Sequence, residues 1–167
     1  MKNGLVRSFS CALVAAMVLA LATALPCSAR ELRTIGTLWV PEFEITAGLP
    51  VLSLSHLTET GPHGGIGLEP IRLTRRIDAG SPALFEAMTS GRRLATVQVR
   101  IQASRHQPQV DYTLGDAVII EYKVAPLADA PGLVETISLR PARLRMDVTT
   151  ARGTVGTCFD FGQRSAC

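Results

Sequence analysis

Few residues of this 167-residue chain have the types and spacing that chemistry requires. The three histidines, His56, His63 and His106, stand at no metal-ligand spacing from one another or from a cysteine or carboxylate. His56 falls in a strand-like run, where a histidine is more often packed than catalytic. No Gly-x-Ser-x-Gly elbow occurs, and no cysteine stands beside a histidine as a nucleophile. The sequence therefore predicts no metal site, no cofactor and no catalytic residue.

Two carboxylates are the nearest approach to an enzyme site. Glu42 and Glu44 share one face if their segment is extended, and a pair of carboxylates is what a glycosidase uses. Carboxylates two residues apart are also common on the wet face of a strand. A hydrolase is therefore the minor hypothesis, and we expect a protein that is not an enzyme.

Phosphate and nucleic-acid binding are also minor hypotheses. The glycine-rich loop at residues 58–70 lacks the Lys-Ser/Thr ending of a phosphate cradle, and no helix follows it at once. Aromatic residues make up only 5% of the chain, so no stacking platform for bases is evident. We expect solvated surface or subunit contacts from the five arginines near the central helix, which are Arg72, Arg75, Arg76, Arg92 and Arg93.

The net charge of the chain falls almost to zero once its first residues are set aside. Lys2 and Arg7 lie in a segment that resembles a signal peptide. Without them, 15 of the 17 Lys and Arg residues remain against 14 Asp and Glu residues. A near-neutral protein has no electrostatic attraction for nucleic acid or for an anionic membrane.

Residues 1–29 have the three parts of a secretory signal peptide. A charged start precedes an apolar run at residues 9–25, and small residues then offer cleavage after Ala24 or Ala29. The apolar run is a little short for a membrane span, although a retained anchor is the alternative. We expect export to the periplasm or outside the cell, with no stable membrane insertion after cleavage.

The cysteines agree with an oxidising compartment. Cleavage after Ala29 leaves Cys158 and Cys167, which flank a short polar tail. A disulfide between them would close the tail at residues 158–167, and two unpaired thiols are the alternative. Cleavage after Ala24 would leave Cys27 as an odd third thiol, which favours the later site.

The mature chain alternates between apolar and polar residues over most of its length. Such period-two runs predict half-buried strands. The runs lie at residues 33–45, 51–57, 71–77, 94–103, 110–124 and 134–149. They give about seven or eight strands with short connections, typical of a sandwich or barrel. Because closure leaves no free strand edge, we expect residues 30–157 to form a closed antiparallel β-barrel.

One helix interrupts the strands at about residues 81–90. Ser81 is a good N-cap, Pro82 suits the first helical position, and Gly91 suits the left-handed position after the last turn. The side chains expected to cover the barrel are the apolar ones of this helix, Leu84, Phe85 and Met88.

The order of these features resembles that of a known family. The strand VLSLSH is followed by the glycine-rich GPHGGIG and then by IRLTRRIDAGSPALFEAMTSGRRLATVQVRI, and YTLGDAVIIEYKV and ETISLRPARLRMDV come after it. This order is similar to that of the Hcp family, the tube protein of type VI secretion, over about residues 34–149. The helix region matches the family signature at Asp78, Ser81, Pro82, Leu84 and Gly91.

The resemblance implies a β-barrel with one flanking helix, assembled as a homo-hexameric ring. Rings would stack into a tube that carries effectors, with no catalysis and no cofactor. Partners would be copies of the chain itself, with secretion-apparatus proteins or effector cargo. The export signal and the cysteine-flanked tail depart from the family pattern, so an exported Hcp-like binding or adhesion domain outside tube assembly is the alternative.

Overall fold

The computed structural model describes residues 33–44, 48–60, 66–127 and 131–167. The predicted signal peptide at residues 1–29 lies outside the described residues, as does His63. Over the described ranges, no helix has the length and apolar character that crossing a membrane requires.

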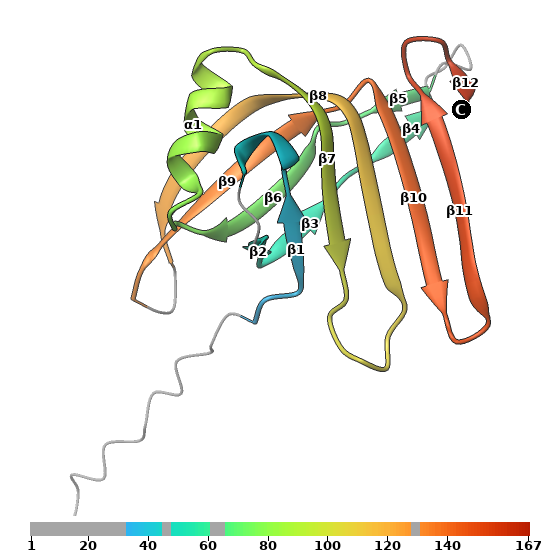
Figure 1. The fold of residues 1–167 in the computed structure, drawn as a ribbon, viewed down its shortest axis with the longest axis horizontal. Coiled ribbons are helices and arrows are strands. Elements are labelled where there is room, and N and C mark those ends of the chain that lie inside the picture. The colour runs from blue at the N-terminus through green and yellow to red at the C-terminus, as the bar shows by residue number, and fades with distance from the viewer. Residues whose placement is uncertain (1–32, 45–47, 61–65, 128–130) are drawn as a thin grey trace, which may run out of the picture.

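The described part of the chain is mainly β with one α-helix, as predicted (Figure 1). Ten strands join one branched antiparallel sheet, and two more form a separate hairpin. The sheet strands are β1 (Gly36–Trp39), β2 (Leu49–Val51), β3 (Ser53–Ser55), β6 (Ile71–Arg76), β7 (Arg93–Ile101), β8 (Gln109–Pro126), β9 (Leu133–Arg140), β10 (Arg143–Thr150), β11 (Gly153–Asp160) and β12 (Ser165–Ala166). The hairpin is β4 (Thr58–Thr60) with β5 (Ile66–Leu68), the short 3₁₀ helix is η1 (Pro41–Phe43), and the α-helix is α1 (Ser81–Thr89).

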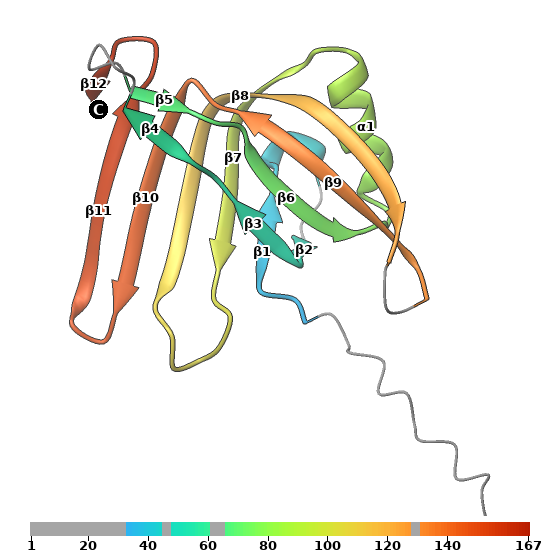
Figure 2. The ribbon, with the colours of Figure 1, turned by 180° about the vertical axis from the view of Figure 1, so that it is seen from behind.

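The 18-residue strand β8 organises the sheet. One edge of β8 pairs with β7, while the opposite edge pairs with β10 along its first half and with β9 along its second. Strands β9 and β10 thus follow one another along the same edge and break at Pro141, which has no N–H to donate to a ladder. The bend in β8 carries β9 and β6 over the face of β1 and β7 (Figures 1 and 2).

The predicted closed barrel is wrong, because no sheet of the described residues closes on itself. Strand β2 pairs only with β1, and β3 pairs only with β6. Leu52 stands between these two three-residue strands and belongs to neither ladder; its N–H donates to the carbonyl oxygen of Thr74. Alternation identifies strands but does not specify where a ladder stops. The sheet instead extends outward through β10 and β11, which leaves an open edge.

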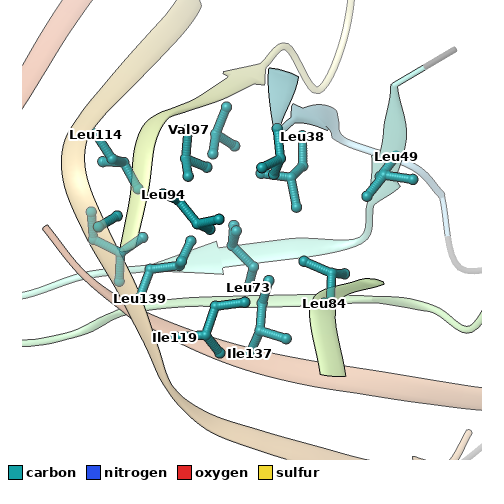
Figure 3. Close-up of a cluster of buried hydrophobic side chains, with 14 of the residues drawn as sticks. Leu38, Leu49, Leu73, Leu84, Leu94, Val97, Leu114, Ile119, Ile137 and Leu139 are labelled. Carbon is teal, nitrogen blue, oxygen red and sulfur yellow. The ribbon is translucent and has the colours of Figure 1, made fainter. Parts of the chain in front are cut away.

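The hydrophobic core lies between two groups of strands, with β1, β7 and the first half of β8 on one side and β6 and β9 on the other (Figure 3). Leu84 of α1 enters it and is 1% exposed. The fully buried members of the core come from strands far apart in the sequence and include Leu38, Leu73, Leu94, Val97, Leu114 and Ile137. The core therefore fixes how β8 bends and where α1 lies.

The start of α1 differs from the prediction. Ser81 is the first helical residue and not the cap. The cap residue is Gly80, which has no side chain that could accept from the first helical turn. Instead, a carboxylate oxygen of Asp78 accepts from the Gly80 N–H, while the hydroxyl of Ser81 accepts from the Asp78 N–H. The turn before the helix is thus closed by Asp78 and Ser81 together.

The end of α1 confirms the prediction. Gly91 has a φ of 63°, in the left-handed region. Its N–H donates to the Met88 carbonyl, and the N–H of Arg92 donates to the Ala87 carbonyl. This pair of bonds is a Schellman motif, which satisfies carbonyls that the last helical turn leaves free.

Candidate assembly surface

A buried ion pair attaches α1 to the sheet. Arg75 of β6 lies opposite Glu135 of β9 in the ladder, and both side chains are 0% exposed. The guanidinium of Arg75 donates to Glu135 with one nitrogen and to Asp78, just before α1, with another. A buried charge of this kind is stable only when it is paired and hydrogen-bonded. Arg75 therefore links two strands to the turn that begins the helix.

Tyr122 of β8 completes this network. Its hydroxyl donates to the second carboxylate oxygen of Glu135. Burial and the neighbouring Glu135 carboxylate raise the pKa of Tyr122 to about 12, so the hydroxyl keeps its proton at neutral pH. We call Arg75, Asp78, Ser81, Tyr122 and Glu135 the helix anchor.

The helix anchor is suited to holding structure in place and not to catalysis. Arginine does not lose its proton in proteins, and both carboxylate oxygens of Glu135 are occupied by donors. Within the described residues, no group of three or more His, Cys, Asp or Glu side chains is arranged to hold a metal ion. The hydrogen bonds and ion pairs of the helix anchor therefore fix the position of α1.

Figure 1 shows α1 at one end of the molecule beside β6, β8 and β9, and these elements and the residue after β6 carry several exposed apolar residues. The ring of Phe85 packs edge-on against Tyr122 with centroids 5.3 Å apart, yet the Phe85 residue is 49% exposed. This half-exposed position corrects the expectation that Phe85 covers the core. We call the exposed apolar residues of this end the helix-side strip; they are Ile77, Phe85, Ile120, Val124 and Leu133.

The opposite end of the molecule presents the open edge of β11 (Figures 1 and 2). Strand β11 pairs with β10 on one side, whereas its other side pairs with β12 only at Phe159 and Asp160. The first five residues of the strand are exposed, and Val155 is 79% exposed. An unpaired strand edge offers backbone donors and acceptors to another chain.

The C-terminal residues fold back on this edge. Cys158 and Cys167 have their Cα atoms 5.3 Å apart, with the sulfur atoms at bonding distance. This geometry suits a disulfide, whose formation in the protein stays a prediction.

The two histidines among the described residues, His56 and His106, do not meet in a common site. His56 makes a hydrogen bond of 3.2 Å between Nε2 and the Tyr112 hydroxyl, with the two rings edge-on. His106 lies in a loop that lines a cleft of about 530 Å³ with Gln109 and Thr149.

The two carboxylates considered for a hydrolase also do other work. An oxygen of Glu42 accepts from the N–H groups of Ala95 and Thr96 and so ties η1 to β7. Glu44 follows η1 with a left-handed φ of 55°. The two are therefore parts of a turn, and they do not form an extended pair facing one site.

The arginines near α1 form no single basic patch. Arg75 is buried in the helix anchor, and Arg72 pairs with Glu121 on the surface at 3.4 Å. Sequence reasoning missed Glu135 and Tyr122 as partners of Arg75. The available signal was the position of Arg75 in phase with the apolar residues of its strand, where a charged side chain must have a buried partner.

Comparison with known proteins places this geometry in context. Residues 36–147 match the family model described as "Type VI secretion system effector, Hcp". The matched segment contains α1 and the whole helix anchor, and it ends before β11 begins. No curated protein matches the sequence significantly.

Solved structures of similar fold carry the same family name. Hcp1 from Salmonella typhimurium is 17% identical with a TM-score of 0.66, and the match covers 80% of this chain and 98% of that one. The secreted protein Hcp3 from Pseudomonas aeruginosa is 22% identical with a TM-score of 0.56, covering 68% and 76%. Hcp1 from Flavobacterium johnsoniae is 20% identical with a TM-score of 0.53, covering 72% and 98%. At these identities the likeness concerns the fold alone.

Proposed function

The chain belongs to the Hcp family of type VI secretion proteins, and we propose that it works as a structural subunit by assembling with copies of itself into a hexameric ring. The family consists of structural secretion proteins and not of enzymes. In this chain the residue types suited to catalysis serve turns, capping and a buried ion pair instead.

The observation that carries the proposal is the placement of two different exposed surfaces at opposite ends of the molecule (Figure 1). A ring requires a heterologous interface, in which one surface of a subunit meets a different surface of the next. The helix-side strip supplies apolar side chains at one end, and the open edge of β11 supplies backbone groups at the other. If these two surfaces met, the two terminal subunits of an open chain would each keep one surface free until the ring closed.

Stacking of such rings into a tube that carries effectors is the further part of the proposal. Export to the periplasm or the medium would follow from the predicted signal peptide at residues 1–29, with residues 30–157 as the folded domain. N-terminal sequencing of the protein recovered from its own compartment would distinguish cleavage after Ala24 from cleavage after Ala29.

A second function is favoured by the C-terminal region. Residues 148–167 lie beyond the family match, and Cys158 and Cys167 fall within them. An exported Hcp-like binding or adhesion domain that does not build tubes would fit this addition. The two functions differ in self-association.

Light scattering coupled to size exclusion tests the proposal on the mature chain over a range of concentrations. We expect a closed assembly with the mass of six subunits. Phe85→Lys should reduce the amount of this assembly at least tenfold at equal protein concentration, because a charge would enter the helix-side strip. Glu86→Lys places the same side chain on the neighbouring exposed position of α1 and serves as the control.

A protein that stays monomeric at every concentration would contradict ring formation and favour the binding domain. Equal loss of assembly in both variants would contradict the role of the helix-side strip. Circular dichroism of each variant verifies that the monomer fold is retained.

A further inference from the structure

The last residues of the chain form a strap across the end of β11. We call residues 161–167 the C-terminal strap. The chain turns after β11, where the Asp160 carboxylate accepts from the N–H of Gln163, and β12 then returns along the β11 edge. The Cys158–Cys167 pair joins the end of the strap to β11.

Without this covalent link the strap has little to hold it. Strand β12 has two residues, and both are exposed. Its ladder on β11 covers only Phe159 and Asp160, and the Cys167 N–H donates to the Cys158 carbonyl at 3.3 Å. The start of the strap is held separately, because the Phe161 N–H donates to the Ala142 carbonyl at 2.9 Å. A short, solvent-exposed ladder without buried apolar side chains opens easily.

The base of the strap also forms one wall of an apolar cavity of about 240 Å³. The rings of Phe159 and Phe161 pack edge-on with centroids 5.1 Å apart, and both line the cavity. The opposite wall comes from the β4–β5 hairpin through Thr58 and Ile66. Phe161 is held by its hydrogen bond to Ala142 and by its packing on Phe159, so the strap leaves the sheet beside this cavity.

We propose that the Cys158–Cys167 disulfide is a redox-controlled latch that closes the strap over the end of the β11 edge. A thiolate of a dithiol reductant attacks the sulfur of Cys167, which is exposed, and Cys158 leaves as a thiolate. The second thiol of the reductant resolves the mixed disulfide. Two electrons and two protons thereby pass to the protein, which gains two thiols, while the reductant becomes a disulfide.

The latch has a structural consequence that does not depend on ring formation. Release of β12 frees the backbone of Phe159 and Asp160, so the open edge of β11 extends over the whole strand. An oxidising compartment therefore keeps the chain in its closed form, and a dithiol reductant opens it.

Hydrogen exchange with mass spectrometry tests the latch on the mature chain, with and without dithiothreitol. Reduction should add 2 Da and raise the exchange rates of strap amides at least tenfold, while peptides from α1 stay unchanged. The Cys158→Ser/Cys167→Ser double variant should exchange like the reduced protein whether or not dithiothreitol is present.

Two results would overturn the latch. One is a strap that exchanges equally fast before and after complete reduction. The other is protein from an oxidising compartment that already carries two free thiols at Cys158 and Cys167.

Discussion

The two ends of this molecule are held together by different means. At the helix end, α1 is fixed by the buried Arg75–Glu135 pair and by Leu84 in the core. At the C-terminal end, β11 has exposed side chains over its first five residues, and the strap is tied by a short ladder and the Cys158–Cys167 pair. One end therefore depends on buried noncovalent contacts, and the other depends on backbone pairing and on the predicted Cys158–Cys167 disulfide.

This difference indicates which end is able to change. Removing one member of a buried ion-pair network is strongly destabilising, because the remaining charge is left without its partner and without water around it. An exposed strap opens without disturbing the core. We therefore expect the helix end to report on global stability and the strap end to respond locally.

The largest effect should follow from Glu135→Ala. It leaves the Arg75 guanidinium buried with only Asp78 as its charged partner, and we expect a loss of about 3–5 kcal/mol in the free energy of unfolding. Urea denaturation measures this loss. Arg145→Ala removes one side of an exposed Arg–Asp pair and should change the midpoint little. Similar losses in both variants would remove the contrast between buried and exposed pairs.

The next effect should follow from breaking the link at the other end. The double variant Cys158→Ser/Cys167→Ser should lose about 2–3 kcal/mol relative to the oxidised wild type, because the unfolded chain regains the freedom of the short loop. Urea denaturation with dithiothreitol should bring the wild type to the stability of the variant. A wild type that dithiothreitol leaves unchanged would show that the link is not formed or contributes nothing.

A smaller effect should follow from Gly91→Ala at the end of α1. The left-handed φ of 63° is unfavourable for alanine, while a Cβ at this position meets nothing within 4 Å. We therefore expect a loss of about 1 kcal/mol from backbone strain alone. Gly67→Ala is a matched control, since its φ is not positive and the nearest atom lies 3.9 Å away. Thermal unfolding measures both variants. A Gly67→Ala variant that is less stable than Gly91→Ala would contradict the role of the left-handed φ at the end of α1.

The smallest effect is confined to alkaline pH. The pKa of Tyr122 is raised from 10.0 to about 12 in the folded protein, so its contribution to stability is complete below pH 10 and is lost as the pH rises from 10 to 12. Tyr122→Phe should flatten this part of the stability profile. Urea midpoints at several pH values between 9 and 12 measure the difference. An unchanged slope in the variant would mean that Tyr122 does not carry it.

Local features of the fold could be predicted from the sequence. The position of α1 and the left-handed Gly91 depend on neighbouring residues alone. Closure of the sheet could not be predicted, because β2 pairs with β1 and β3 with β6, and these pairings depend on strands distant in the sequence. The Arg75–Glu135 pair joins residues 60 positions apart, and no local pattern specifies that partner.

Single-particle electron microscopy of the purified mature chain tests most directly whether this fold assembles into a ring. We expect class averages of closed rings with six-fold symmetry. Uniform particles of monomer size at every concentration, with the fold intact by circular dichroism, would contradict ring assembly.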